Sequence, residues 1–254
     1  MSIIGIISMK GGVGKTSVTA NLAVSLASKL GEARVSTIDL DPQNGLQWHF
    51  GLEAQARDGV CELSLKQDTW GHEQMLLGYD VACLPYGQGK EEDREAFENL
   101  LTNDPTWLAD QIKRLGLYKD AVVLIDTPPG VSVYLKQVFA CADLLLIVVL
   151  ADAGSYATIP SMETSIDELK ISNPQIKSAY VINQVERRRT LNRDVADLLQ
   201  SYLGDRLVPV GIHADSAVGE ALAFQQPVLV YDPHGQASHD YDELAKWVIE
   251  SLNE

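Results

Sequence analysis

The chain has 254 residues, and its 35 acidic side chains outnumber its 20 lysines and arginines, so the formal net charge at neutral pH is -15. A charge of this sign opposes nonspecific binding of the whole chain to nucleic acid or to an anionic membrane surface. Hydrophobic residues make up 46% of the sequence and charged residues 22%, which is typical of a globular protein and argues against a largely disordered chain.

The cysteines and the apolar runs indicate the compartment. Cys61, Cys83 and Cys141 lie far apart, so they form neither a disulfide framework nor a zinc site, and we expect buried thiols. The longest apolar run, 144–151, is too short for a bilayer, which needs about 20 residues. The N-terminus has no secretion signal pattern. We therefore expect a cytoplasmic protein.

The first forty residues predict a strand, a glycine-rich turn, a helix and a second strand. The strand covers 3–8, and the helix covers 16–30 because leucine or valine recurs on one face at positions 18, 22, 26 and 30. The second strand covers 35–40. This order is a βαβ unit, which builds parallel sheets.

The same alternation continues to the end of the chain. Strands are predicted at 81–84, 121–125, 144–150, 178–183 and 207–210, and helices at 105–117, 133–141, 159–169, 193–202, 216–224 and 241–252. No linker, composition break or repeat divides the chain, so we expect one domain over residues 1–254. The fold class is α/β, with a doubly wound, mostly parallel sheet flanked by helices. Residues 45–74 are the least periodic and give no firm prediction.

The turn between the first strand and the first helix carries the clearest motif, Lys-Gly-Gly-Val-Gly-Lys-Thr at 10–16. Glycines let backbone N–H groups converge on phosphate oxygens, and the helix N-terminus adds its dipole. Lys15 is placed to reach the β and γ phosphates, and the Thr16 hydroxyl to bind Mg²⁺. The common pattern has glycine where Met9 stands, so only the variant with a lysine before the double glycine fits.

This variant resembles the deviant Walker A motif of the MinD/ParA family of P-loop ATPases. The similarity extends to four further segments: 38–43, 124–130, 181–184 and the region from Val208 onward. It implies that ATP or ADP is bound by Gly11, Gly12, Val13, Gly14, Lys15, Thr16 and Ser17. It also implies that Lys10 is the signature lysine, which crosses to the partner's nucleotide in an ATP-bound homodimer, and that Lys10 and Lys15 both act in catalysis.

Three aspartates follow predicted strands, where open α/β sheets bind ligands. Asp126 can hold Mg²⁺ through a water, although an aspartate can also simply end a strand. The resemblance assigns Asp41 the placement of the attacking water and Asp39 a supporting contact near Mg²⁺, with a solvated turn as the alternative for Asp41. The stiff segment 127–130 is placed to sense the γ-phosphate. The expected metal-site residues are thus Thr16, Asp39 and Asp126.

The adenine site is expected around Asn183. This residue ends a predicted strand, and its amide offers both a donor and an acceptor to a base edge. By itself such an asparagine is usually a turn residue, but the family uses the matching residue to contact the base. Pro209 and the residues up to Ile212 are a second expected contact with the base.

Several branches of the family can be compared with the residues. Cys83 and Cys141 do not match the cysteines of the iron–sulfur branch. The C-terminal segment 240–254 is acidic, unlike a helix that inserts directly into membranes. The one basic cluster, 187–193, could be a solvated helix entrance, a nucleotide or interface contact, or a DNA site. DNA binding is disfavoured by the net charge.

Two stretches, 83–88 and 212–228, resemble the BcsQ branch, the MinD-like proteins of bacterial cellulose-synthase operons. That resemblance implies a cytoplasmic accessory subunit with slow, Mg²⁺-dependent ATP hydrolysis. Its partners would be a small operon protein and the inner-membrane cellulose synthase complex, to which it would be recruited at the membrane or the cell pole. The alternatives are a DNA- or cargo-partitioning ATPase and, more distantly, a metabolic P-loop kinase, which would leave Lys10 unexplained.

Overall fold

The computed structural model describes residues 1–52, 58–66, 70–71, 74–171 and 173–253. Its strands form one sheet in the order β3-β4-β2-β5-β1-β6-β7, parallel throughout except for β3, which is antiparallel to β4. The strands are β1 (Ser2–Ile7), β2 (Val35–Asp39), β3 (Leu76–Gly78), β4 (Val81–Leu84), β5 (Val122–Asp126), β6 (Leu144–Leu150) and β7 (Lys177–Asn183). The predicted mostly parallel α/β fold is confirmed.

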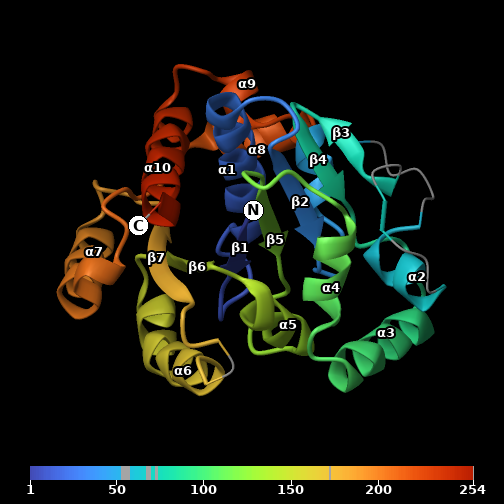
Figure 1. Cartoon of the computed structure of the whole chain (residues 1–254). Coiled ribbons are helices and arrows are strands. Elements are labelled where there is room, and N and C mark those ends of the chain that lie inside the picture. Colours follow the sequence, from blue (N-terminus) through green and yellow to red (C-terminus); the bar gives the residue numbers. More distant parts are fainter. Residues whose placement is uncertain (53–57, 67–69, 72–73, 172, 254) are drawn as a thin grey trace.

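Helices cover both faces of the sheet, as the arrangement in Figure 1 shows. On one face pack α1 (Lys15–Leu30), α8 (Ser216–Ala223), α9 (Val228–Tyr231), α10 (Gln236–Asn253) and the short 3₁₀ helix η1 (Leu46–Phe50). On the other pack α2 (Val60–Leu65), α3 (Glu91–Asn103), α4 (Trp107–Arg114), α5 (Val133–Cys141), α6 (Ala153–Leu169) and α7 (Thr190–Leu203), which a second 3₁₀ helix, η3 (Gly204–Arg206), follows.

Each central strand contributes to both cores because successive side chains point to opposite faces. Along β1, Ile4 and Ile6 enter the core beneath α1, whereas Ile3 and Ile7 enter the core on the other face. Between them Gly5 lets α5 approach closely, since a Cβ there would lie 2.3 Å from a methyl of Val138. A strand buried on both faces reads as a continuous apolar run, as the sequence shows.

The register brings the carboxyl ends of β1, β2 and β5 to one edge of the sheet. Asp39 in β2 and Ile6 in β1 both pair with Asp126 in β5. The residues that follow these strands therefore meet above the sheet edge, which is where ligands of open parallel sheets bind. The candidate site lies there.

The predicted strand 207–210 is wrong. The segment meets β7 through an isolated bridge between Tyr180 and Leu207, and a second bridge, between Val185 and His213, lies beyond the end of β7. Pro209 has no backbone N–H to donate to a ladder, so regular pairing stops at this position. The segment still runs beside β7, since Val208 and Ile212 donate to carbonyls of that strand.

The helix predicted from residue 193 begins three residues earlier, at Thr190, and two further helices begin five or six residues earlier than expected. The helix predicted from residue 159 begins at Ala153, because Asp152 caps it by accepting from the N–H of Ser155. The helix predicted from residue 241 begins at Gln236. These polar first turns carry no apolar periodicity, so the pattern alone placed their starts too late.

The helices α2, α3 and α9 were not predicted, and α3 is the longest of them. In α3 only Phe97 and Leu101 are buried, which is too sparse a pattern to predict a helix. Its first turn instead carries three acidic residues, which favour a helix N-terminus, and Asp93 accepts from the N–H of Lys90. Phe97 packs edge-on against Trp107 of α4 with ring centroids 5.2 Å apart. Part of the region without a firm prediction lies outside the described residues.

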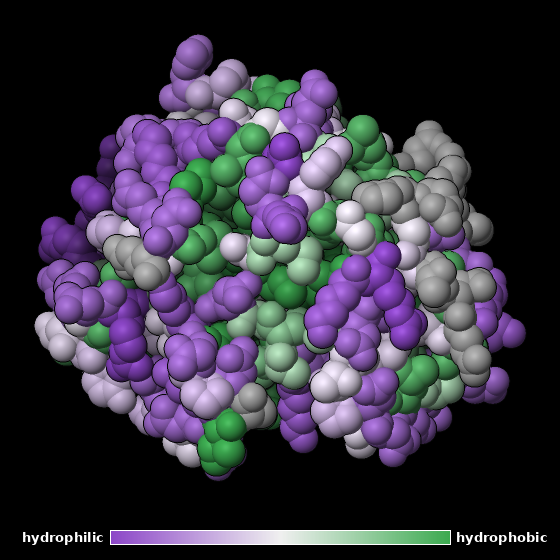
Figure 2. Space-filling view, in the orientation of Figure 1, coloured by the Kyte–Doolittle hydropathy of each residue, from purple (hydrophilic) through white to green (hydrophobic). Residues whose placement is uncertain are grey.

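Cys61 and Cys83 are buried as expected, while Cys141 is partly buried. Burial raises the pKa of the Cys61 thiol to about 11 and those of Cys83 and Cys141 to about 12. All three therefore stay protonated at neutral pH. Among the described residues, no helix combines the length and the apolar character that crossing a membrane requires. On the face shown in Figure 2, hydrophilic residues predominate and hydrophobic ones gather near the middle.

Candidate functional site

The glycine loop between β1 and α1 adopts a conformation that only its glycines allow without strain. Gly12 and Gly14 have φ angles of 77° and 81°, in the left-handed region. A Cβ on Gly14 would also lie 2.4 Å from the Asn183 amide nitrogen. The loop borders a cavity of about 340 Å³ lined by Ser8, Lys10 to Ser17, Asp41, Gln43 and Pro129. The structure thus brings together the predicted phosphate-binding residues around one hollow.

A buried network behind the loop centres on Asp126. Its Oδ1 accepts from Lys15 Nζ at 2.9 Å and from the Thr19 hydroxyl at 3.1 Å, and its Oδ2 accepts from the Thr16 hydroxyl at 2.7 Å. Lys15 is only 6% exposed and Asp126 is fully buried. The charge pair and its hydroxyl donors therefore hold the start of α1 against the end of β5.

Asp39 clamps the turn after β2. Its two carboxylate oxygens accept from the N–H groups of Asp41 and Leu46, at 2.9 and 3.1 Å. Burial, and then the neighbouring Asp126 carboxylate, raise the pKa of Asp39 well above its ordinary value. In this arrangement Asp39 supports the loop from behind, and its backbone contacts occupy the oxygens that the sequence assigned to a metal contact.

Asp41 lies closer to the mouth of the cavity. One carboxylate oxygen accepts from the Gln43 N–H at 3.0 Å, and the other lies 3.9 Å from Lys15 Nζ. Burial raises the pKa of Asp41, although the Gln43 N–H and the charge of Lys15 act in the opposite direction. The carboxylate therefore borders the space beside the phosphate loop without closing it.

Lys10 has a different environment from Lys15. Its ammonium group pairs with Asp152 at 2.9 Å, and both side chains are exposed, at 44% and 38%. Asp152 follows β6 and also caps α6. Although burial opposes the effect, the Ser155 N–H and Lys10 hold the pKa of Asp152 below its ordinary value. An exposed pair of this kind contributes only about 0–1 kcal/mol, so Lys10 can change partners at small cost.

The segment after β5 is tied to the phosphate loop. Thr127 donates its hydroxyl to the Ile6 carbonyl at 3.0 Å, and Gly130 donates its N–H to the Ser8 carbonyl at 2.7 Å. Pro129 lines the cavity directly. These two bonds hold the segment against β1 and against Ser8, at one wall of the cavity.

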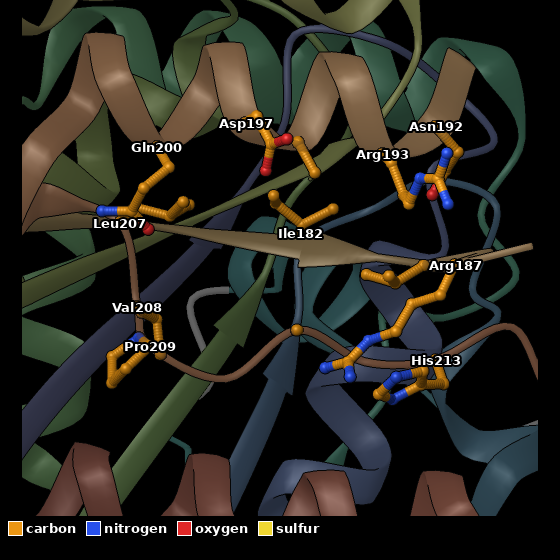
Figure 3. A pocket seen from close by; sticks show the side chains of 13 residues that line it. Ile182, Arg187, Asn192, Arg193, Asp197, Gln200, Leu207, Val208, Pro209 and His213 are labelled. Carbon is orange, nitrogen blue, oxygen red and sulfur yellow. The ribbon is translucent and has the colours of Figure 1, made fainter. Parts of the chain in front are cut away.

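The two expected base contacts have different surroundings. Asn183 is buried and donates to the Val13 carbonyl at 2.8 Å, which places its amide against the phosphate loop. Pro209 is exposed and lines a neighbouring groove beneath α7 (Figure 3). The structure therefore puts Asn183 beside the predicted phosphate cavity and leaves Pro209 at its periphery.

Two residues of the site were missed by the sequence reasoning. Thr19 stands one helical turn after Lys15, so the helical period places both on one side of α1. Asp152 follows the carboxyl end of β6, the same signal that identified Asp126 and Asn183. In both cases the signal was present, and only the fold shows which acceptor or donor each residue meets.

The glycine loop, its helix and the buried Lys15–Asp126 pair, at the carboxyl end of a parallel sheet, define a P-loop nucleotide-binding protein of the MinD/ParA type. A profile of the family described as cellulose biosynthesis protein BcsQ matches residues 1–249. The chain belongs to this family.

Individual relatives agree with the profile. Cellulose biosynthesis protein BcsQ of Escherichia coli K12 is 30% identical over 252 residues, covering 98% of this chain and 94% of the relative. Chromosome partitioning protein ParA of Caulobacter vibrioides NA1000 is 27% identical over 267 residues, with the same coverage. Septum site-determining protein MinD of Pyrococcus horikoshii, solved with Mg-ADP, has a TM-score of 0.74 at 22% identity and covers 97% of this chain and 95% of its own.

Proposed function

We propose that the chain is a Mg²⁺-dependent ATPase whose ATP-bound form dimerises, and that this switch serves the bacterial cellulose synthase machinery. The observation that carries the proposal is the unequal placement of two lysines at one phosphate loop. Lys15 is buried against Asp126, whereas Lys10 is exposed and pairs with Asp152. One lysine is placed for the nucleotide of its own subunit, and the other is available to a second nucleotide.

Nucleotide binding uses the backbone first. The N–H groups of the loop and of the first turn of α1 receive the phosphate oxygens, because the glycine conformations point them toward the cavity. Lys15, already beside the loop, adds its charge to the β and γ phosphates. Asn183, which lies against Gly14 and donates to the Val13 carbonyl, would contact the adenine, and Pro209 would border the base.

The residues present fit Mg²⁺. The Thr16 hydroxyl and the Asp126 carboxylate, whose oxygens lie 2.7 Å apart, are the hard oxygen donors that this ion prefers. Thr16 would bind the ion directly and Asp126 through a water, while Asp39 supports the loop from behind. When bound, Mg²⁺ neutralises phosphate charge. The MinD relative solved with Mg-ADP supports the choice of cofactor.

Hydrolysis requires a water placed in line with the γ-phosphate. Asp41 is suited to orient it, because the Gln43 N–H fixes one of its carboxylate oxygens and leaves the carboxylate at the cavity wall. Lys10 from the second subunit would stabilise the charge that develops on the phosphates. Because that lysine arrives only on dimerisation, turnover and dimer formation are coupled, and slow hydrolysis in the isolated chain is expected.

The family assignment supports the cellular role. As a BcsQ relative, the chain would act in the cytoplasm beside the inner-membrane cellulose synthase complex, together with a small operon partner, and would govern assembly or polar placement. Recruitment would come from these partners and not from direct insertion. The C-terminal helix α10 is acidic, and its Lys246 is paired with Asp242 and Glu243.

The decisive experiment compares Lys10→Ala with the wild type by light scattering after size exclusion, with and without ATP. The variant is expected to bind ATP as a monomer with wild-type affinity and to fail to dimerise. Lys113→Ala, which removes an exposed lysine from α4, is the matched control and should dimerise normally. A Lys10→Ala protein that dimerises as tightly as the wild type contradicts the switch.

A partitioning ATPase that binds DNA is the second candidate. The observation that favours it is the presence of Arg187, Arg188 and Arg193 at one end of α7, exposed and, within the described residues, without an ion pair. The identity with Caulobacter ParA is consistent with this candidate. ATP-dependent, salt-sensitive retention on nonspecific DNA would support this second candidate. Under the first candidate the acidic chain should not be retained.

A further inference from the structure

A groove outside the phosphate site runs between α7 and the segment 207–213 that follows it (Figure 3). Its volume is about 330 Å³, within the range of pockets that take a small ligand or the side chains of a bound peptide. Its floor is apolar and is formed by Ile182, Val185, Ala196 and Leu207. Regular strand pairing with β7 stops at Pro209. In the described part of the chain, β7 is therefore an edge strand, and no further strand covers the groove.

Arg187 and Arg193 line the same groove, from the loop after β7 and from the first turn of α7. Both are exposed, and in the described part of the chain neither takes part in an ion pair or a side-chain hydrogen bond. Arg189 differs, because Glu186 neutralises it at 2.8 Å. Two uncompensated guanidinium groups beside one pocket are unusual in a chain with a net charge of -15.

His213 adds a third polar group to the groove and is held rigidly. Asp240, buried in α10, accepts from the His213 backbone N–H at 2.8 Å and contacts the ring Nδ1 at 2.8 Å. Gln236 in turn donates to the other oxygen of Asp240 at 2.8 Å. The ring orientation is therefore fixed from behind, and Figure 3 shows Arg187 extending toward His213 across the groove.

We propose that this groove binds an acidic, amphipathic peptide segment of a partner protein. Carboxylates of the peptide would pair with Arg187 and Arg193, and an apolar side chain between them would enter the floor beside Ala196. Guanidinium groups suit bidentate contacts with carboxylates, and arginine is enriched at protein interfaces. The inference deepens the proposed function, on which it rests for the nature of the partner, a component of the secretion machinery.

The surroundings favour a peptide over a nucleic acid. Asp194 and Asp197 are exposed on the same helix, and Asp197 lines the groove, so a continuous chain of phosphates would meet these carboxylates, whereas a peptide can place uncharged side chains there. The apolar floor would be left empty by a phosphodiester backbone but filled by a leucine or valine side chain. The groove therefore combines a cationic end with an apolar floor.

The test uses three fluorescent probes in an anisotropy titration of the full chain. The first is a peptide of about 14 residues with alternating glutamate and leucine pairs, which spans about four turns when helical. The second carries lysine in place of each glutamate, and the third is a 30-base-pair DNA of about three turns. Nonspecific attraction to an acidic protein would favour the lysine peptide. Saturable binding of the glutamate peptide therefore requires a local cationic site.

The variants identify that site. Arg187→Glu and Arg193→Glu should each weaken the glutamate peptide by about tenfold or more, and Ala196→Phe, which fills the floor without changing charge, should weaken it comparably. Arg114→Glu reverses an exposed arginine on α4 and should have no effect. Thermal unfolding and ATP-dependent dimerisation are measured on each variant and are expected to match the wild type. These controls separate failure of this proposal from failure of the ATP switch.

Four outcomes overturn the proposal. Binding of the DNA that depends on Arg187, without binding of the glutamate peptide, would make the cluster a nucleic-acid site. A peptide affinity that falls equally in Arg114→Glu, or no peptide binding at all, would remove the local site. Loss of ATP-dependent dimerisation in Arg187→Glu would assign the groove to contacts between two copies of this chain.

Discussion

The interior of the phosphate site and its rim use charge in opposite ways. In the interior, Lys15 and Asp126 are buried and saturated by contacts with each other and with two threonine hydroxyls. At the rim, Lys10 and Asp152 form a single exposed pair. A buried pair is costly to break because it leaves an uncompensated charge, whereas an exposed pair exchanges partners almost freely. The interior pair therefore fixes the geometry of the site, whereas the rim pair can be exchanged for other contacts.

The largest effect is expected from Lys15→Ala, which removes the buried cation of the interior. The variant should lose nucleotide binding by about 100-fold or more, because charge-assisted contacts are worth about 1.5–3 kcal/mol each and Lys15 is placed for two phosphates. Isothermal titration with ATP measures the loss. Lys29→Ala, at the far end of α1, is the control and should bind normally. Unchanged affinity in Lys15→Ala would refute the phosphate-loop assignment.

Asp41 lies at the cavity wall, between the buried interior and the exposed rim. Asp41→Ala tests whether this carboxylate acts in hydrolysis and not in binding. ATP binding and dimerisation should persist, while hydrolysis slows about 10- to 100-fold, because a water-orienting carboxylate acts mainly on the transition state. Single-turnover hydrolysis and light scattering on the same sample test both halves of the prediction. Wild-type turnover, or a protein that stays monomeric with ATP, would show that Asp41 belongs to another step.

A second buried group, His49 in η1, is expected to make the stability of the fold depend on pH. Burial lowers the pKa of His49 from 6.5 to about 4. The ring is therefore neutral in the fold, and its contribution to stability is present above pH 6.5 and is lost as the pH falls toward 4. Between pH 7 and pH 5 the loss amounts to about 2 kcal/mol.

Urea unfolding of the wild type and of His49→Gln at both pH values isolates this effect. The raised pKa of Asp39 acts with the opposite sign, since it favours the fold at low pH, and it is common to both proteins. His239→Gln, on the exposed side of α10, should keep the wild-type pH dependence. If His49→Gln keeps it too, His49 is not the group that titrates.

The smallest effect is expected at the rim. Asp152→Asn preserves a cap acceptor for α6 but removes the charge paired with Lys10, so stability should change by less than about 0.5 kcal/mol. Releasing Lys10 should tighten ATP-dependent dimerisation up to about fivefold, which corresponds to about 1 kcal/mol. Sedimentation at several protein concentrations measures it. A weaker dimer would mean that Asp152 itself belongs to the interface.

Much of the site could be predicted because its determinants are local. The glycine loop, its two lysines and Thr16 lie within seven consecutive residues, and the backbone conformation that they need is a property of glycine itself. Asp126 and Asn183 were found because each ends a buried apolar strand, and such strands are evident from their composition. The segment 207–210 also looked like a strand, but Pro209 interrupted its pairing.

The parallel α/β architecture, the phosphate loop and the polar residues that follow the strands could be predicted from the sequence alone. Each depends on a short stretch of residues: the apolar periodicity of a helix or strand, the conformational freedom of glycine, or the residue at the end of a strand. Which charged side chains are buried and which are exposed depends on the tertiary structure and could not be predicted from the sequence. Lys10 and Lys15 are five positions apart and chemically identical, yet packing encloses one against Asp126 and leaves the other beside Asp152. Burial depends on elements more than 100 residues away in the chain, and no local pattern records it.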